Sequence, residues 1–519
     1  IVKIAITSSV VLLCSGFALY SFFRLSAAEG QKDFNLYELV PSTTSAVFVT
    51  DDVLEFVAEV DELTCSKNQQ YLYVSKLFSY LKQSLYALSE DTPHGLSRQM
   101  NQMLISFHEP DNERNQVLYC RLGNGDKELV NRFVRKYISS LYPPKTFIYK
   151  GEEIIIYPMA DGDFLACYLT SDFMALSFQK KLIENVIDAY KSGKSLADDS
   201  TFTGIRAPKK SAAAATIYTR MQGMMGWTEF DMKMKDDFIY FSGITHDADT
   251  CFAFINQLRQ QQSVKGFPGE VLPSTAFYFS RQGITDWVSL LSYGNAQGQS
   301  VSTRTSEVQN RDKEFSRYLM ENAGQDLVAC LFQREDTLQG AAAVLSLSVA
   351  DVTEAERMLR ALVSAAPADE GRRNPRITFC YTVNKAYPIY RLPQTTLFEQ
   401  LTSFAEPTLD VYAAFYGGRL LLAPDADALA HYIRQLDKGE VLNGAMVYQT
   451  GMDHLSDSYH FMLMADFDHI FQQSENHVRF VPDFFLRNAD FFRHFTLFVQ
   501  FACADGVVYP NIVLKYKSE

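Results

Sequence analysis

Two stretches of this 519-residue chain repeat one pattern at a constant spacing. In each, a strand-like apolar run leads into a helix-like pattern that ends at a glycine. The two glycines, Gly193 and Gly439, stand 246 positions apart (439 − 193), and at the same offset Ile187 meets Ile433. A gapless match across helix, cap and following strand is hard to obtain by chance, so the sequence predicts two copies of one unit. Both glycines suit a helix C-cap, where a positive φ favours glycine.

The rest of each copy follows the same order of elements. A Pro-Ser-Thr turn that begins at Pro41 or Pro273 precedes a strand-like run and then apolar residues at helical spacing. A strand, a helix and a strand pair are expected next, at 117–122, 127–138 and 146–157 in the first copy and at 344–349, 352–363 and 377–390 in the second. A hairpin pattern closes each copy, with turns at Asp236-Asp237 and Asp505-Gly506.

These patterns predict an α+β fold, in which an N-terminal transmembrane helix precedes two similar halves of antiparallel sheet, each with helices that cover one sheet face. We expect residues 1–33 to form a membrane anchor and short linker, 34–265 the first α+β repeat and 266–519 the second. The turn-forming run Gly266-Phe267-Pro268-Gly269 marks the join. The polar stretch 295–311 is expected to be a surface loop.

The segment from Ile4 to Phe23 contains no charged residue. As a helix at about 1.5 Å per residue it would span roughly 30 Å, the thickness of the hydrocarbon core of a bilayer. We therefore expect a single membrane-spanning anchor with the body outside the cytoplasm. A cleaved signal peptide, with Ser26-Ala27-Ala28 as its small-residue site, and a buried core helix are the alternatives. No second run of 18 apolar residues follows, so the sequence does not indicate a channel or transporter.

The net charge of −13 argues against nucleic acid as a partner, because phosphate binding needs clustered Lys and Arg. The eight cysteines form no Cys-x-x-Cys pair, so the usual zinc and redox signatures are missing. We expect most of them to be small buried hydrophobic residues. A disulfide or two stays open if the body is extracytoplasmic.

No segment predicts a catalytic, cofactor or metal site. Gly193-Lys194-Ser195 resembles the end of a phosphate-binding loop, but it follows a helix, and Asp188 stands where that loop needs a glycine. Ser79-Tyr80-Leu81-Lys82 fits Ser-x-x-Lys without the companion motifs. The densest group of possible metal ligands has no known ligand spacing and is interpreted as a solvated loop and strand edge. It comprises Asp453, His454, Asp457, His460, Asp466, Asp468 and His469.

Trp227 and Trp287 are interpreted as core anchors. Met221, Met224 and Met225 form an adaptable group that could serve a partner, although core packing is the simpler use.

Three segments resemble a known family: 39–43 (Leu-Val-Pro-Ser-Thr), 191–202 (Lys-Ser-Gly-Lys-Ser-Leu-Ala-Asp-Asp-Ser-Thr-Phe) and Ile217-Tyr218-Thr219. The family consists of uncharacterised membrane-anchored envelope proteins of Gram-negative bacteria, known only as a domain of unknown function. The resemblance covers most of the body, although its motifs are structural turns and caps. In the second copy, Gly439-Glu440-Val441-Leu442 departs from it and lacks both the Lys-Ser and the acidic pair. The resemblance implies an anchored, extracytoplasmic protein and brings no catalytic residues.

We therefore expect a non-enzymatic, single-pass inner-membrane protein whose body acts in the periplasm as a scaffold or binding module. Its expected partners are the membrane, through Ile4 to Phe23, and a protein of the envelope. Two alternatives stay open: a carrier of a lipid or other apolar ligand, and an envelope hydrolase with an unrecognised site. A closed, packed interior would exclude the carrier, and a cleft with convergent titratable groups would favour the hydrolase.

Overall fold

The structure is a computed structural model. It describes residues 34–68, 100–108, 114–123, 126–134, 142–159, 162–205, 213–220, 226–246, 253–288, 290–291, 306–334, 341–365, 376–383, 385–402, 410–473, 481 and 483–517. The membrane helix expected at 4–23 lies outside these residues. Within them, no helix is both long enough and apolar enough to cross a membrane.

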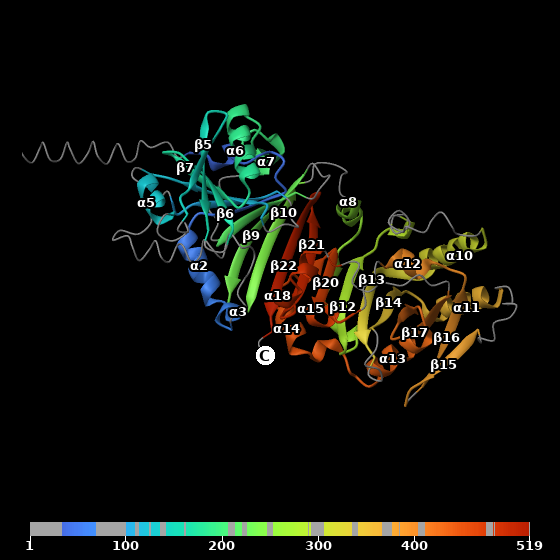
Figure 1. Cartoon of the computed structure of the whole chain (residues 1–519). Coiled ribbons are helices and arrows are strands. Elements are labelled where there is room, and N and C mark those ends of the chain that lie inside the picture. The colour runs from blue at the N-terminus through green and yellow to red at the C-terminus, as the bar shows by residue number, and fades with distance from the viewer. Residues whose placement is uncertain are drawn as a thin grey trace, which may run out of the picture. The chain divides into compact units, whose positions relative to one another are not determined.

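The chain divides into two compact units (Figure 1). Among the described residues, the first unit contains those within 34–44, 49–54 and 100–203, and the second contains those within 45–48, 55–68 and 204–517. The repeat boundary expected between 265 and 266 therefore falls inside the second unit. A boundary between repeats need not be a boundary between compact units, so the predicted division stays a prediction.

The first unit is an antiparallel sheet with helices packed on it. In spatial order its strands are β2 (Met103–Phe107), β3 (Gln116–Arg121), β7 (Phe173–Ser177), β6 (Phe164–Leu169), β5 (Glu152–Pro158) and β4 (Lys145–Tyr149). Its helices are η1 (Leu36–Glu38), α5 (Asp126–Phe133) and α6 (Lys180–Ser192). Helix α6 is amphipathic and buries Ile183, Val186 and Ile187, because residues three or four apart lie on one helix face.

The second unit contains a longer antiparallel sheet. In spatial order its strands are β8 (Ala215–Thr219), β9 (Trp227–Lys235), β10 (Phe238–His246), β22 (Val507–Tyr516), β21 (Phe495–Ala504), β20 (Phe461–Asp466), β12 (Ala276–Gly283), β13 (Ala323–Gln333), β14 (Ala341–Val349), β18 (Arg419–Ala423), β17 (Asp410–Tyr416), β16 (Ala386–Pro393) and β15 (Ile377–Tyr381). A short pair, β11 (Val264–Lys265) with β19 (Ser458–Tyr459), lies apart from it. The middle strands run side by side in Figure 1.

Short and long helices complete the second unit. They are α3 (Thr64–Lys67), α8 (Ala253–Arg259), η3 (Pro268–Val271), α10 (Ser306–Asn322), α11 (Val352–Ala365), α12 (Leu397–Leu401), α13 (Ala426–Asp437), η5 (Leu442–Gly444), α14 (Met446–Met452), α15 (Phe467–Phe471), α17 (Asp483–Arg487) and α18 (Ala489–Phe492). Strand β1 (Ala46–Thr50), helix α2 (Val53–Glu62) and helix α7 (Ser200–Ile205) fall at the boundaries between the units.

Helices cover both faces of the second sheet, which corrects the expectation of a single covered face. Ile389 belongs to the core that α13 buries, whereas the hydroxyl of the next residue, Tyr390, accepts a hydrogen bond from Arg360 of α11. Neighbouring strand residues point to opposite faces, so α13 and α11 lie on opposite sides. The sequence already indicated this arrangement, because residues 327–332 are apolar without a break and all of them are buried. A strand that is apolar at every position needs cover on both faces.

The α+β class and the antiparallel pairing are confirmed, and most predicted elements form within a few residues of their expected ends. The exception is 295–311, expected to be a loop, because α10 begins at Ser306. Its Val308, Phe315 and Leu319 are buried, and their wide spacing among polar residues hid the helix from the sequence pattern.

Candidate functional site

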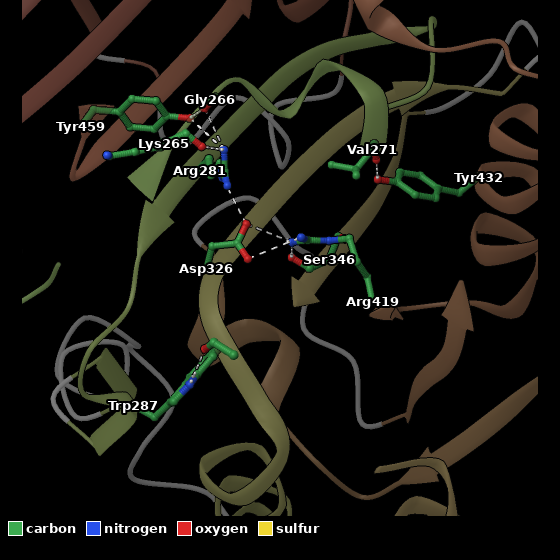
Figure 2. Close-up of polar contacts among 11 residues, drawn as sticks. Lys265, Gly266, Val271, Arg281, Trp287, Asp326, Ser346, Arg419, Tyr432 and Tyr459 are labelled. Atoms are coloured by element: carbon green, nitrogen blue, oxygen red, sulfur yellow. Dashed lines mark hydrogen bonds and ion pairs between the residues drawn. The ribbon is translucent and has the colours of Figure 1, made fainter. Parts of the chain in front are cut away.

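A largely buried group of three charged side chains forms an Arg–Asp–Arg cluster on the face of the second sheet that α13 covers (Figure 2). Arg281 projects from β12, Asp326 from β13 and Arg419 from β18. The Nε atom of Arg281 lies 3.1 Å from Oδ2 of Asp326, and a terminal nitrogen of Arg419 lies 3.2 Å from the same oxygen. The exposed fractions of the three side chains are only 16%, 9% and 14%.

Both arginines also donate hydrogen bonds to other groups. Arg419 donates to the hydroxyl of Ser346 at 2.5 Å and to its carbonyl at 2.9 Å. Arg281 donates to the Gly266 carbonyl at 2.9 Å and to the Tyr459 hydroxyl at 3.2 Å, and Tyr459 itself donates to Gly266 at 2.8 Å. These contacts, drawn in Figure 2, link β12, β13, β14 and β18 to Gly266 and to Tyr459 of β19.

Electrostatics explain why Asp326 stays ionised. Burial alone would raise its pKa, but Arg419, the Ser348 hydroxyl and Arg281 together hold the pKa of this carboxyl below its usual value. Each charged group therefore has partners inside the protein, which a buried ion pair requires. The cluster fastens the predicted join at Gly266 to the sheet, and the sequence did not reveal it because its members are far apart in the chain.

The Gly193-Lys194-Ser195 segment is a structural turn. Gly193 caps the C-terminus of α6 with φ of 63°, and the Ser195 hydroxyl donates to Asp198 at 2.7 Å. Ser195 also forms an isolated β-bridge with Pro41. A phosphate site would use the opposite end of a helix, where backbone N–H groups point outward.

The predicted second copy contains matching backbone contacts. Pro273 forms a bridge with Val441, and Gly439 has φ of 77°. Ser42 donates its N–H to the Lys194 carbonyl at 3.3 Å, and Ser274 donates to that of Glu440 at 2.8 Å. A hydrogen bond from Leu196 to Val40 (2.8 Å) likewise matches one from Leu442 to Leu272 (2.9 Å). The Pro-Ser-Thr turns thus hold the loop that follows each capped helix.

The His/Asp group between 453 and 469 does not converge. The His454 ring lies 4.4 Å from the Phe238 ring, Asp457 accepts from the Gly266 N–H, and His460 accepts from the Cys503 N–H. Asp466 pairs with Lys517 at 2.7 Å and with His469 at 3.5 Å. Across the described ranges, no three His, Cys, Asp or Glu side chains are placed to hold a metal ion.

The remaining candidates divide into core residues and residues that lie outside the described ranges. Trp227 and Trp287 are buried, as predicted, and Trp287 donates to the Gly324 carbonyl at 3.3 Å. Free thiols are buried at Cys65, Cys120, Cys167, Cys330 and Cys380 and half-buried at Cys503. Burial raises the pKa of Cys120 to about 12, which keeps this thiol protonated and unreactive. Residues 79–82, Met221, Met224, Met225, Cys14 and Cys251 lie outside the described residues.

The end strands of both sheets expose large apolar side chains, which sequence reasoning missed. In the first unit, Phe147 and Ile148 of β4 are exposed, and in the second unit Ile377, Phe379 and Tyr381 of β15 are exposed. The sequence indicated strands here but not which strands end the sheets. An available signal was charge, because both strands lie in basic stretches of an acidic chain.

No family model matches the chain, and no curated protein or solved structure is significantly similar to it. The resemblance to envelope proteins of unknown function therefore stays a prediction.

Proposed function

We propose that this chain is a membrane-tethered, non-catalytic binding protein of the bacterial envelope, built from two related α+β halves. The tether is the uncharged segment from Ile4 to Phe23, and the body acts on the periplasmic side of the inner membrane. The observation that carries the binding role is the exposure of large apolar side chains along the end strand of each sheet.

The strand order supports a duplicated body. The order β3-β7-β6-β5-β4 in the first unit is the order β14-β18-β17-β16-β15 in the second. The antiparallel meander β8-β9-β10 likewise corresponds to β20-β21-β22. Because the Pro41 and Pro273 bridges sit at matching places in this order, a common origin explains sequence offset and topology together.

Exposed apolar surface supports binding rather than chemistry. Ile148 is 71% exposed and Tyr381 is 70% exposed, and each lies on the end strand of its sheet. Water contact with such side chains is unfavourable, so a cluster of them marks an interaction surface. Several titratable residues that the sequence singled out are instead engaged in the fold: Asp457 accepts from the Gly266 N–H, and Asp466 pairs with Lys517 and His469.

Affinity capture from detergent-solubilised membranes tests the binding role. We expect the tagged full chain to capture the same envelope protein in independent preparations. A matched variant, Ile148→Ser with Phe379→Ser and Tyr381→Ser, should lose that protein while keeping its fold. Capture of no reproducible protein by the unaltered chain would overturn the proposal.

Fractionation tests the tether. We expect the full chain to stay in the membrane pellet after alkaline carbonate extraction, and the body to be digested by protease added to spheroplasts. Release of the chain by carbonate, or protection of the body in intact spheroplasts, would contradict the tethered periplasmic placement.

A further inference from the structure

Strand β15 has the features of an edge that accepts another strand. Its Ile377, Phe379 and Tyr381 alternate along the strand, so their side chains share one face, and they are 42%, 54% and 70% exposed. Cys380 points to the other face, where it is buried beside the Ala430 carbonyl of α13. One face of the strand is therefore fixed to the core, and the other presents an apolar row to solvent.

The backbone of the same residues faces outward. The Arg391 N–H donates to the Arg376 carbonyl at 2.9 Å, and the Thr382 N–H donates to the Lys385 carbonyl at 3.0 Å. Hydrogen-bonded pairs alternate along an antiparallel ladder, so the even-numbered residues from 376 to 382 pair with β16. Ile377, Phe379 and Tyr381 then direct their N–H and C=O groups away from β16. Of the strands in the described structure, only β16 pairs with β15.

The strand lies in a strongly basic stretch of an acidic chain. Between Gly371 and Phe398 there is no Asp or Glu, whereas the whole chain has a net charge of −13. The basic residues in that interval are Arg372, Arg373, Arg376, Lys385 and Arg391. Arg391 is buried and pairs with Asp410 at 2.9 Å, and Arg376 donates to the Val363 and Ser364 carbonyls, so Lys385 carries the charge that we assign to partner binding. Lys385 is exposed in the turn that follows β15, and its Nζ lies over the Tyr387 ring at 5.2 Å. Charge complementarity therefore favours an acidic partner.

We propose that β15 binds an extended, acidic segment of a partner protein, which adds to the sheet as a further antiparallel or parallel strand. The segment alternates apolar residues that pack on Ile377, Phe379 and Tyr381, and it carries Asp or Glu beside Lys385. Main-chain hydrogen bonds to the outward N–H and C=O groups would supply affinity, and the apolar row and the charge would supply specificity.

Two other occupants fit the same surface less well. A lipid bilayer offers no partners for the outward N–H and C=O groups, and each such group left unpaired in hydrocarbon is costly. A second copy of this chain would place one basic stretch against another, and like charges oppose such pairing. An acidic strand satisfies the backbone and the charge together.

Peptide binding to the full chain in detergent tests the inference, which rests on the proposed binding function. The probes are a fluorescent eight-residue peptide with alternating Val and Thr between Glu pairs, and the same peptide between Lys pairs. We expect the acidic peptide to bind with an affinity that falls as salt is raised, and the Lys peptide to bind about tenfold or more weakly. Equal binding of both peptides, or of neither, would overturn the inference.

Two variants and a control locate the binding. Phe379→Pro removes an outward N–H without removing a bond to β16, because proline is tolerated on the open side of an edge strand. It should weaken acidic-peptide binding about tenfold or more, as should Lys385→Glu. Val288→Ser, an exposed apolar residue away from this strand, should leave binding unchanged. Unfolding followed by tryptophan fluorescence verifies that each variant is folded, because Trp227 and Trp287 both lie in the second unit.

Amide hydrogen exchange distinguishes strand addition from side-chain contact alone. On peptide binding, the amides of Ile377, Phe379 and Tyr381 should become protected, whereas those of Thr378 and Cys380 should already be slow. Binding without this odd-numbered protection would exclude strand addition.

Protection of these amides by anionic vesicles without peptide would assign the edge to a membrane instead. Concentration-dependent self-association that is lost in Phe379→Pro would assign it to a second copy of this chain. If affinity capture from solubilised membranes yields a partner protein, and Lys385→Glu does not reduce the amount captured, the binding function stands and the β15 inference fails.

Discussion

At the scale of single residues, the fold depends on charges placed where water is scarce. Asp326 lies between Arg281 and Arg419, and removing its charge leaves two guanidinium groups in a mostly buried site. We expect Asp326→Asn to lower the free energy of unfolding of the second unit by about 3–5 kcal/mol. Urea unfolding followed by tryptophan fluorescence measures this change.

A matched control separates burial from charge. Asp490 pairs with Arg493 at 3.8 Å and is fully exposed, so Asp490→Asn should leave the unfolding midpoint almost unchanged. Equal effects of the two substitutions would show that the cluster of Arg281, Asp326 and Arg419 has no special role in stability.

His469 gives stability a pH dependence. The neighbouring Asp466 carboxylate raises the pKa of His469 above its ordinary 6.5, although burial opposes the shift. A group whose pKa is raised by folding stabilises the protein fully below its unfolded pKa and loses that contribution as pH rises through the folded value. We therefore expect the stability difference between the natural chain and His469→Gln to be largest near pH 5.5 and to shrink toward pH 8.5.

Urea unfolding at a series of pH values checks this expectation. A difference that is constant with pH, or that grows as pH rises, would contradict the assignment to His469.

At the scale of elements, two glycines with positive φ end matched helices: Gly193 is the C-cap of α6, and Gly439 follows Lys438, the C-cap of α13. Gly193 and Gly439 have φ of 63° and 77°, and an added Cβ at either would meet nothing within 4 Å. The cost of Gly→Ala is therefore conformational, and we expect each substitution to lower the free energy of unfolding by about 1–2 kcal/mol. Gly204→Ala in α7, where φ is not positive, should be neutral or slightly stabilising.

Differential scanning calorimetry measures the three variants. A protein with two compact units can unfold in two separate thermal transitions. We expect Gly193→Ala to lower the transition temperature of the first unit and Gly439→Ala to lower that of the second. No shift in either variant would show that these glycines do not determine helix stability.

Some features of the fold could be predicted from the sequence, and others could not. The sequence predicted α6, α11 and most hairpins, because helical spacing, capping glycines and turn pairs depend on residues that are close together in the chain. The Arg281–Asp326–Arg419 cluster could not be predicted, because three strands separated by more than forty residues bring it together. The exposure of Phe379 was also hidden, since an apolar alternation looks the same on an edge strand as on an inner one.

At the scale of the molecule, β10 and β22 form a seam between segments that are far apart in the sequence. The register runs from Phe238 opposite Lys515 to Thr245 opposite Val508, and it is interrupted beside Pro510, which has no N–H to donate. We expect Ile512→Pro, inside the paired part of the seam, to destabilise the second unit by about 3 kcal/mol or more. Pro510→Val should have little effect, and tryptophan fluorescence during urea unfolding compares the two.

The seam also sets an order of events during synthesis. Between the end of β10 at His246 and the start of β22 at Val507 there are 260 residues (506 − 246). At roughly 5–20 residues per second, the ribosome needs tens of seconds to deliver the strand that covers β10. Throughout that interval the nascent meander has an open edge, which is a site for mispairing. We therefore expect cells that make this protein to protect the half-finished sheet, and a chaperone that recognises exposed strands to act on the β10 edge first.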